Sequence, residues 1–516
     1  MPAERTFFLT TPIFYVNDQP HIGHAYNEVA CDALARFMRL DGWRVKFLTG
    51  TDEHGQKVEQ SARQAGISPQ EFTDRISPAF REMARLLDIS NDDFIRTTEP
   101  RHIRAVEALW RELERRGEIY LGRFSGWYAV RDEAFYDESE LVDGKAPSGA
   151  AVEWVEEENY FFRLSAWQDR LLAYYEENPE AVAPRSRRNE VISFVRGGLK
   201  DLSISRTSFS WGVPVPGHLG HIVYVWFDAL INYLSAVGYP DTENPDFSAF
   251  WPTAFHMVGK DIIRFHAVYW PAFLMAAGLL PPRRVFAHGW WTVAGQKMSK
   301  SLGNVVAPQQ LVDTYGLDPV RYFLLREFPF GNDGDFSHRA IVGRRNGDLA
   351  NDFGNLAQRV LTLIQRNCGA AVLAPGAFST PDRALLDAAR ALLPAVRGHM
   401  TEPAFHLALE AIWHVVGEAN RYVDETAPWA LARTDPARMS TVLYTLAEVI
   451  RHLAILMQPF VPGSAGKLLD QLAVKPGERD FRALAEAPLK PGTRLPRPEG
   501  IFPRFVESAT AADGQG

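Results

Sequence analysis

The chain has 516 residues, of which 46% are hydrophobic and 12% aromatic, and its formal net charge at pH 7 is −8. A chain of this length is too long for one hydrophobic core, so we expect roughly two to four domains. The acidic balance excludes a protein that is basic over its whole surface, although it leaves room for a local basic face. Two cysteines, Cys31 and Cys368, cannot form a disulfide framework or a cysteine-rich zinc site.

The sequence shows no segment typical of a membrane span or a secretion signal. Its longest apolar stretch, residues 267–280, is too short to cross a bilayer and contains Pro271. The N-terminus has no basic region that leads into an apolar run and a small-residue cleavage site. We therefore expect a soluble, cytoplasmic protein without membrane contacts.

The first part of the chain predicts a parallel α/β sheet. Residues 6–16 form an apolar, β-branched and aromatic run that predicts a buried strand. Apolar positions then recur at helical spacing over residues 21–40, and residues 45–50 predict a second strand that ends at residues 51–55. In such sheets ligands bind beyond the carboxyl ends of the strands, and Asp52 falls there.

The residue pattern of the sequence changes twice further along the chain. Between about residues 120 and 211, short aromatic runs alternate with acidic and Gly/Pro-bearing turns, which predicts an inserted, partly β module. The α/β pattern resumes at residues 223–288 and is followed by a connector. Residues 343–472 contain long amphipathic stretches that predict a helical bundle.

Two short segments carry the strongest chemical signal. The first, His21-Ile22-Gly23-His24, opens the first predicted helix, where backbone N–H groups and a positive potential favour phosphate, and Gly23 allows close approach. The second, Lys297-Met298-Ser299-Lys300-Ser301, lies in a loop between Gly295 and Gly303 that can close over phosphates.

Together the two segments predict an ATP site. We expect His21, His24, Lys297 and Lys300 to stabilise the charge that develops on the triphosphate, with Gly23, Met298, Ser299 and Ser301 completing the site. The alternative is that these histidines and lysines are solvated surface groups. The sequence has no Gly-x-x-x-x-Gly-Lys-Ser/Thr segment, so a P-loop nucleotide site is not supported.

In this order, the two segments look like the paired signature of class I aminoacyl-tRNA synthetases. Over nearly its whole length the chain resembles the methionyl-tRNA synthetase family. The matching segments are Thr11-Pro12-Ile13-Phe14-Tyr15, Thr51-Asp52-Glu53-His54-Gly55, Tyr224-Val225-Trp226-Phe227-Asp228-Ala229-Leu230, Gly259-Lys260-Asp261-Ile262 with Phe265-His266, and Gly331-Asn332-Asp333-Gly334-Asp335-Phe336.

The resemblance implies a division of the chain into six parts. They are two halves of a Rossmann-like parallel-sheet catalytic domain (1–115 and 223–292), an inserted α+β connective module (116–222), a lysine-loop connector (293–342), an all-α anticodon-binding bundle (343–480) and a tail (481–516). The implied activity is ATP-dependent activation of L-methionine to methionyl-adenylate and its transfer to the 3′ end of tRNA(Met).

The resemblance also implies a methionine pocket, in which Asp52 holds the substrate ammonium. Aromatic walls suit a polarizable thioether, and a carboxylate facing an ammonium gains from a low local dielectric. Without the resemblance, the aromatic residues would be interpreted as core packing. The implied lining consists of Ile13, Tyr15, Asp52, Trp226, Ala229, Leu230, Tyr233, Phe265, His266 and Trp270.

In the bundle, the resemblance assigns anticodon recognition to Asn355, Arg359 and Trp429. The spacing of Asn355 and Arg359 places them on one helix face, and an indole can stack on an unpaired base. The alternative is an exposed helix pair and a packed tryptophan.

The sequence departs from the family pattern at two points, and each departure leads to a prediction. Many members have a cysteine zinc knuckle in the connective module, but residues 127–136 contain no cysteine, so we expect no structural zinc and only the Mg²⁺ that arrives with ATP. The C-terminal dimerisation domain of some members has no counterpart after the bundle, so we expect a monomer.

Three other functions remain as alternatives. A sister synthetase for Leu, Ile, Val or Cys shares both signature segments, but the large editing insertion of the first three is missing. A non-catalytic tRNA-binding relative has no need of His21, His24, Lys297 and Lys300. A generic nucleotide-binding α/β protein leaves the helical bundle unexplained.

Overall fold

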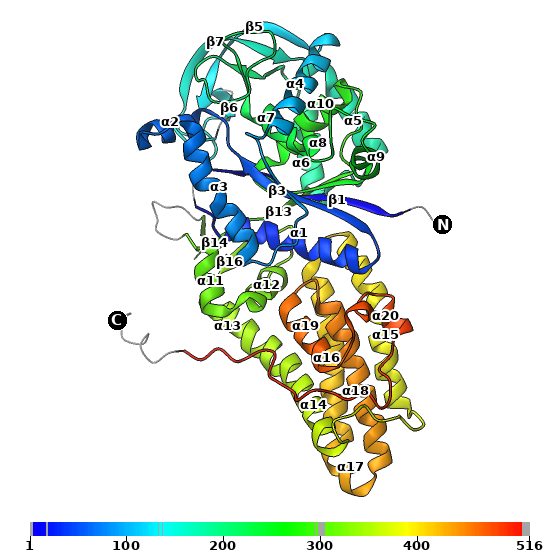
Figure 1. Ribbon diagram of the computed structural model, residues 1–516. Helices are drawn as coiled ribbons and strands as arrows, with labels where there is room; N and C mark the ends of the chain where they lie inside the picture. The colour runs from blue at the N-terminus through cyan, green and yellow to red at the C-terminus, as the bar shows by residue number, and fades with distance from the viewer. Residues whose placement is uncertain are drawn as a thin grey trace. The chain divides into compact units, whose positions relative to one another are not determined.

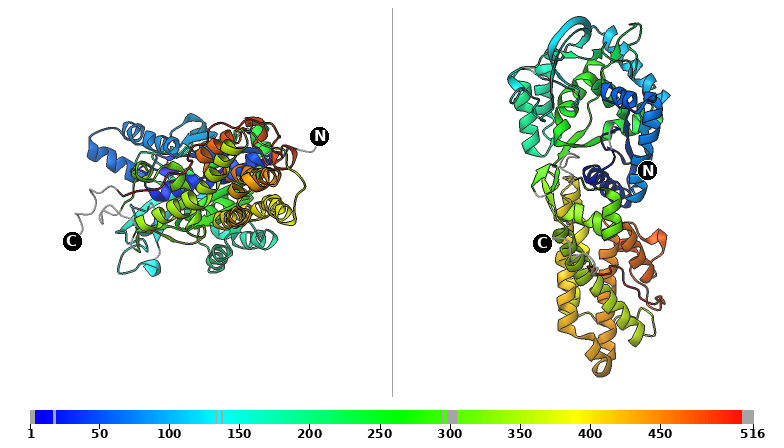
Figure 2. Two further views of the ribbon diagram at one scale, coloured as in Figure 1. Left: turned by 90° about the horizontal axis from the view of Figure 1, so that it is seen from below. Right: turned by 90° about the vertical axis from the view of Figure 1, so that its left-hand side faces the viewer.

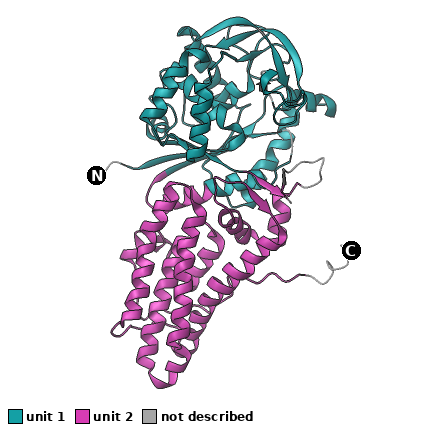
Figure 3. Cartoon of the chain, turned by 180° about the vertical axis from the view of Figure 1, so that it is seen from behind, with its two compact units in different colours: residues 1–31, 45–289 teal, residues 32–44, 290–516 magenta. Residues whose placement is uncertain are grey.

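The computed structural model describes residues 4–16, 19–132, 134–136, 138–293, 295–297 and 305–507. The chain forms two compact units, residues 1–31 with 45–289 and residues 32–44 with 290–516 (Figure 3). Helix α1 (Ile22–Leu40) begins in the first unit and ends in the second.

A parallel sheet forms the core of the first unit (Figure 1). Within the described ranges it has seven strands, in the order β2-β3-β1-β12-β13-β8, with β4 beside β3. Phe8, Phe47 and Val258 are fully buried, as expected for strands that are covered on both faces. The strands are β1 (Thr6–Thr10), β2 (Phe14–Tyr15), β3 (Arg44–Asp52), β4 (Asp93–Arg96), β8 (Val182–Ala183), β12 (Ala254–Gly259) and β13 (Arg284–His288).

The strand predicted over residues 6–16 is interrupted in the structure. β1 ends at Thr10 and β2 starts at Phe14, because Pro12 has no N–H to continue a ladder. The backbone N–H of Thr11 still donates to the carbonyl of Leu48 at 3.0 Å, so the chain stays beside β3 while it turns. This interruption directs Pro12 and Ile13 towards the carboxyl end of the sheet.

Helices connect these strands, and two of them begin at a residue whose side chain is recorded as a cap. At the start of α3, the Ser68 side chain accepts a hydrogen bond from the N–H of Glu71, and Pro69 takes the first helical position. The helices of this unit are α1, α2 (Gln56–Ala65), α3 (Pro69–Leu86), α4 (Pro100–Arg115), α5 (Gln168–Glu177), α6 (Arg185–Arg196), α7 (Val225–Leu230), α8 (Asn232–Ser235), α9 (Pro245–Phe250) and α10 (Trp270–Ala276).

A second sheet of antiparallel strands forms most of the inserted module, in the order β6-β5-β7-β9. β5 and β7 form its long central pair, in register from Ile119 opposite Phe162 to Tyr128 opposite Glu153. The module is not wholly separate, since β8, which lies within residues 116–222, pairs with β13 of the parallel sheet. Its strands are β5 (Ile119–Ala129), β6 (Ala134–Tyr136), β7 (Glu153–Phe162) and β9 (Leu202–Ser203), followed by the pair β10 (Ser205–Arg206) and β11 (Ile222–Val223).

The second unit starts with a small sheet and continues as helices. β14 (Trp291–Val293) pairs antiparallel with β15 (Gln296–Lys297) and parallel with β16 (Gly334–Phe336). The turn before β15 contains Gly295 at φ +71°, a conformation that favours glycine. The helices are α11 (Pro308–Tyr315), α12 (Leu317–Arg326), α13 (His338–Arg344), a π-helical segment (Arg345–Gly354), α14 (Asn355–Asn367), α15 (Thr380–Thr401), α16 (Phe405–Thr426), α17 (Pro428–Thr434), α18 (Pro436–Met457), α19 (Pro462–Gln471) and α20 (Ala483–Glu486).

Helices α15, α16 and α18 pack against one another along their length (Figure 2). Among the described residues, α18 is the one helix long and apolar enough by composition to cross a membrane, but 89% of its most apolar window is buried inside the protein. It is therefore the central helix of the bundle. The parallel sheet and this helical bundle confirm the predicted fold class.

Candidate active site

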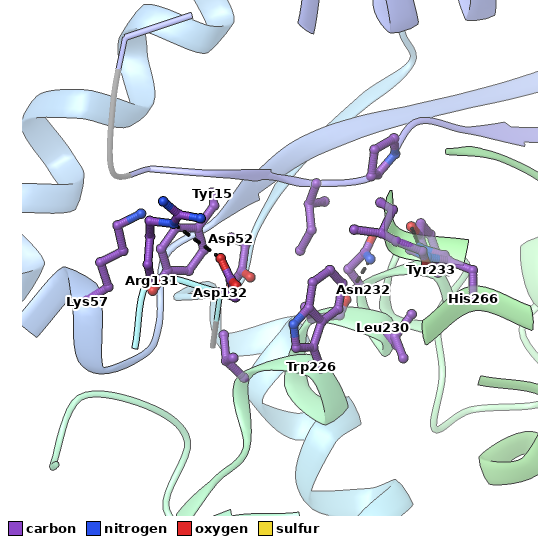
Figure 4. Close-up of a pocket in the computed structure, with 15 residues that line it drawn as sticks. Tyr15, Asp52, Lys57, Arg131, Asp132, Trp226, Leu230, Asn232, Tyr233 and His266 are labelled. Atoms are coloured by element: carbon purple, nitrogen blue, oxygen red, sulfur yellow. Dashed lines mark hydrogen bonds and ion pairs between the residues drawn. The ribbon is translucent and has the colours of Figure 1, made fainter. Parts of the chain in front are cut away.

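The carboxyl ends of β1 and β3 border a cavity of about 220 Å³ (Figure 4). Helices α7 and α8 and the segment around Ile262 close its other sides. Pockets for drug-sized ligands usually measure about 300–1,000 Å³, so this cavity suits a ligand the size of an amino acid side chain with its backbone groups.

Eight of the ten residues that the sequence assigned to a methionine pocket line this cavity, and Phe265 and Trp270 are not part of its lining. Phe265 stacks on Trp226 with ring centroids 3.7 Å apart and ring planes at 9°. Trp270 is fully buried and donates its indole N–H to Nε2 of His256 at 3.3 Å. The lining residues are Ile13, Tyr15, Asp52, Trp226, Ala229, Leu230, Tyr233 and His266.

Three consecutive acidic and basic residues at the end of β3 have three different environments. Asp52 lines the cavity and is 7% exposed. Glu53 accepts two hydrogen bonds from the guanidinium of Arg96, at 2.7 and 2.9 Å. His54 contacts the carboxylate of Asp228 at 2.6 Å. Of these three side chains, only the Asp52 carboxylate lies where a ligand in the cavity could reach it.

Asp228 is a buried anchor between α7 and the end of β3. Its carboxylate contacts Nδ1 of His54 at 2.6 Å and Nε2 of His102 at 2.8 Å. Burial acts to raise the pKa of Asp228, but the two imidazoles outweigh it and lower the pKa to about 2. Because a carboxylate only accepts, both histidines donate N–H groups to it. The contact holds α7, which carries Trp226, against the strand end that carries Asp52.

Replacing Asp228 with Asn is expected to lower the free energy of unfolding by about 3–5 kcal/mol at pH 7, since it removes a buried carboxylate that accepts hydrogen bonds from two buried histidines. The pKa of Asp228 is lowered on folding, so its stabilisation is present above the unfolded-state pKa of about 4 and is lost as the pH falls towards about 2. Urea unfolding of both proteins at several pH values measures this. Asp246→Asn removes only an exposed partner of Lys46 and should cost less than about 1 kcal/mol. Equal midpoints for Asp228→Asn and the wild type would contradict the anchoring role.

The two histidines of the first signature segment form a defined pair at the N-terminus of α1. The N–H of His21 donates to Nδ1 of His24 at 3.1 Å, and the N–H of Gly23 donates to Nδ1 of His21 at 3.0 Å. Because each Nδ1 accepts, the ring hydrogen of each histidine lies on Nε2. Burial, together with the neighbouring His21, lowers the pKa of His24 well below its usual value. His24 is therefore a neutral Nε2–H donor.

The conformation of this pair depends on its neighbours. A Cβ atom at position 23 would lie 2.9 Å from Cε1 of His21, so glycine leaves room for the ring. The two imidazoles lie with centroids 3.9 Å apart, and Phe14 and Phe80 pack edge-on against His24. No acidic residue occupies the first turn of α1, so the positive helix end is not neutralised there. These features suit the binding of an anion such as a phosphate group.

The pattern His-x-Gly-His occurs a second time, at residues 218–221. This copy forms a turn between β10 and β11, where His218 contacts the hydroxyl of Tyr160 at 2.6 Å and the carboxylate of Glu114 at 2.8 Å. Leu219 within it is fully exposed. The turn does not open a helix, so it lacks the cluster of N–H groups found at α1. The motif has chemical meaning only with the helix that follows it.

Most of the lysine segment lies outside the described residues. Lys297 belongs to β15, where its backbone pairs with Thr292 of β14. Met298, Ser299, Lys300 and Ser301 are not among the described residues.

Three charged cavity residues carried no recognisable signal in the sequence. Lys57 comes from α2, and Arg131 and Asp132 come from the turn after β5 in the inserted module (Figure 4). Nζ of Lys57 lies 5.7 Å from the ring centroid of Tyr15, and Arg131 donates to the carbonyl of Ser148 at 2.6 Å. The sequence does not indicate that the module brings Arg131 and Asp132 to the cavity, and nothing in the sequence distinguishes Lys57 from an ordinary lysine of a surface helix. Of the remaining lining residues, Pro12, Val225 and Asn232 adjoin predicted ones in the sequence, and Ile262 lies three positions before Phe265.

The segment expected to lack zinc is organised by polar contacts between side chains. Asp132 accepts hydrogen bonds from Tyr136, at 3.2 Å, and from Ser148. Within the part of the chain that the structure describes, no three His, Cys, Asp or Glu side chains are grouped so as to hold a metal ion.

In the second unit, the three residues assigned to anticodon binding lie at the ends of α14 and α17. Asn355 is exposed at the start of α14 and Arg359 follows one turn later. The guanidinium of Arg359 lies 5.6 Å from the ring centroid of Trp429 and donates to Asp424 at 2.8 Å. Trp429 is 47% exposed, which is unusual for a large aromatic residue and offers a face on which a base can stack.

Comparison with protein families agrees with this geometry. Residues 7–152 and 136–361 match the family described as tRNA synthetases class I (M), and residues 372–513 match the anticodon binding domain of methionyl tRNA ligase. The parallel sheet, the segment His21-Ile22-Gly23-His24 at the start of α1 and the following helical bundle are those of a class I aminoacyl-tRNA synthetase.

Relatives that match over their full length identify the family within this class of synthetases. A methionine–tRNA ligase of Mesorhizobium japonicum is 59% identical over 99% of both chains, and one of Mycobacterium bovis is 55% identical over 97% of this chain and 98% of the relative. The solved structure of Mycobacterium tuberculosis methionyl-tRNA synthetase in complex with methionyl-adenylate matches with a TM-score of 0.95 and 55% identity, covering 97% of this chain and all of the other. The chain belongs to the methionyl-tRNA synthetase family.

Proposed function

We propose that this protein activates L-methionine with ATP to methionyl-adenylate and transfers the methionyl group to the 3′ end of tRNA(Met). The observation that carries this proposal is the cavity that combines the buried Asp52 carboxylate with the aromatic walls of Tyr15, Trp226 and Tyr233. It occurs in a chain that is 59% identical over nearly its full length to a methionine–tRNA ligase.

Methionine binding is the first step. The ammonium group of the substrate pairs with Asp52, and the thioether side chain packs between the aromatic walls, which favour a flexible and polarizable group. His266 does not add a charge to the pocket, because burial lowers its pKa to about 4. The pocket therefore offers the Asp52 carboxylate for the ammonium, and its histidine adds no charge beside the aromatic walls that receive the side chain.

Adenylate formation follows. A carboxylate oxygen of methionine attacks the α-phosphorus of ATP, which arrives with its Mg²⁺, and pyrophosphate leaves. The Nε2–H groups of His21 and His24, the N-terminus of α1 and the ammonium groups of Lys297 and Lys300 stabilise the charge that develops on the phosphate oxygens. Since no covalent bond to the enzyme is needed, positioning and electrostatics supply the rate enhancement.

Transfer to tRNA completes the reaction. The 2′-hydroxyl of the terminal adenosine attacks the carbonyl carbon of the adenylate, and AMP leaves. Asn355, Arg359 and Trp429 bind the unpaired anticodon bases by hydrogen bonding and stacking. We further propose that the protein acts as a monomer in the cytoplasm and holds no structural zinc.

Replacing Trp429 with Ala is expected to affect transfer to tRNA but not the activation of methionine. We expect methionine-dependent ATP–pyrophosphate exchange to remain within about twofold of the wild type, because Trp429 lies in the helical unit and not in the cavity. Loss of a base-stacking contact costs about 1–3 kcal/mol, so kcat/KM for tRNA(Met) should fall about 5- to 150-fold. Aminoacylation assays with tRNA(Met) measure the second effect. Equal losses in both assays would contradict an anticodon role.

A further inference from the structure

The segment of residues 331–336 carries part of the family resemblance, but it contributes no residue to the cavity. It ends in β16, which lies beside β14 (Figure 1), and β14 pairs in turn with β15. In this register Asp335 lies opposite Thr292, and Thr292 lies opposite Lys297. The segment therefore runs beside the hairpin of β14 and β15, in which the lysine segment starts.

The strand ladder of this hairpin is short. Among the described residues, β15 consists of Gln296 and Lys297, so two residue pairs join it to β14. A two-stranded hairpin is marginally stable in water even when its strands are longer. A fixed place for Lys297 therefore requires contacts from outside the hairpin.

The side chain of Asp335 makes such contacts. Its Oδ1 atom accepts hydrogen bonds from the N–H of Gly295, at 2.9 Å, and from the hydroxyl of Thr292, at 2.7 Å. The hydroxyl also lies 3.2 Å from the carbonyl of Gly334, but its single hydrogen favours the closer, charged oxygen. Gly295 belongs to the turn, at φ +71°, and not to the ladder. One carboxylate oxygen therefore joins the turn to β14.

β14 itself is fixed within the second unit. The ring of Trp291 is 3% exposed and packs against Phe323 of α12, with centroids 5.2 Å apart. At the start of the strand, the N–H of Trp290 donates to Oδ1 of Asp333 at 2.8 Å. Because β14 is held in this way, the hydrogen bond from the turn to Asp335 also holds β15.

We propose that Asp335 is a positioning residue for the activation of methionine, and that it acts by holding the turn before Lys297. A group that stabilises a developing charge must be in place before the reaction, and a displacement of about 1 Å can lower the rate about 10²-fold. Asp335 does not line the cavity, so its loss should change the rate and not the binding of methionine. This inference rests on the proposed function, in which Lys297 stabilises the charge on the phosphate oxygens.

Three variants test the proposal in single-turnover formation of methionyl-adenylate. Asp335→Ala removes both hydrogen bonds, whereas Asp335→Asn keeps an oxygen that can accept them. Asp480→Ala is the matched control, because Asp480 is also a partly exposed residue of the second unit that accepts from a backbone N–H, that of Ala483 at 3.0 Å. Calorimetric titration with methionine counts the binding sites, so rates are expressed per site and a loss of folded protein does not enter them.

For Asp335→Ala, we expect the rate per site to fall about 10- to 100-fold, while Kd for methionine stays within about twofold of the wild type. Asp335→Asn should recover the rate to within about fivefold, and Asp480→Ala should keep it within about twofold. An unchanged rate in Asp335→Ala, or an equal loss in Asp480→Ala, would overturn the proposal. So would a weakening of methionine binding that accounts for the whole loss.

The combination with Lys297→Ala shows whether Asp335 acts through this lysine. Lys297→Ala alone should lower the rate about 10²–10³-fold, the effect of removing one group that stabilises a developing anion. In that background Asp335→Ala should lower the rate by no more than about threefold further, because the group to be positioned is gone. Fully additive losses would overturn the proposal.

A last measurement needs no activity. Amide hydrogen exchange, followed by mass spectrometry with fragmentation that resolves Gly295, reports on the turn itself. We expect exchange at Gly295 to be about tenfold faster in Asp335→Ala than in the wild type, and nearly unchanged in Asp335→Asn and Asp480→Ala. Equal exchange in all four proteins would overturn the proposal. If the wild type formed no adenylate with methionine while this exchange depended on Asp335, the proposed function would fail and the contact between Asp335 and the turn would stand.

Discussion

Replacing Asp52 with Asn is expected to lower kcat/KM for methionine in ATP–pyrophosphate exchange by about 10²–10³-fold. Truncating one partner of a buried charge pair costs about 2–5 kcal/mol, and the amide leaves the substrate ammonium without its counter-charge. Asp52 is 7% exposed, so water screens this pair only weakly. The change conserves shape, and KM for ATP should therefore remain close to that of the wild type.

The control for this experiment is the other carboxylate of the cavity. Asp132→Asn alters a residue that also lines the cavity but already accepts hydrogen bonds from Tyr136 and Ser148. We expect it to change kcat/KM for methionine by no more than about fivefold, as a loss of up to about 1 kcal/mol implies. Equal effects of the two substitutions would mean that the ammonium is not held by Asp52.

Replacing Lys300 with Ala is expected to reduce kcat for methionine activation by about 10²–10³-fold, the effect of removing one group that stabilises a developing anion. Methionine binding should be unchanged, because the proposed contacts with methionine come from Asp52 and the aromatic walls of the cavity. Single-turnover formation of adenylate measures the first quantity and calorimetric titration with methionine measures the second.

Lys490→Ala, at an exposed position of the second unit, controls for the loss of a positive charge in general and should leave kcat within about twofold. A normal activation rate in Lys300→Ala would show that Lys300 does not take part in catalysis. A matching loss of methionine affinity would show instead that the substitution disturbs the pocket.

The fold could be predicted from the sequence where periodicity and burial agree. The helical spacing after His21 gives α1, and the apolar run at residues 45–50 gives the centre of β3. The part that could not be predicted is the return of the chain to the sheet within the inserted module. β8 has only two residues, Val182 and Ala183, which is too short for a periodic signal, and its place beside β13 is a long-range pairing.

The cavity could be predicted only through the family resemblance. Trp226 and Tyr233 are ordinary core residues by composition, and no spacing rule separates a cavity wall from a packed core. The structure brings Tyr15, Asp52 and Trp226 around one cavity, but their roles in binding methionine stay predictions.

Supporting residues were harder to find than lining residues. Asp228 lies in a segment that matched the family, yet nothing in the sequence indicates that it joins His54 to His102. Such roles depend on residues more than 100 positions apart, so they become visible only in three dimensions.

Whether this chain activates methionine can be measured by ATP–pyrophosphate exchange with the purified protein, without tRNA, against each of the twenty amino acids. We expect strong exchange with methionine and weak exchange with all other amino acids. Exchange driven by a different amino acid would leave the fold and the ATP site standing but contradict the pocket assignment. No exchange from folded protein with any amino acid would contradict the synthetase activity itself.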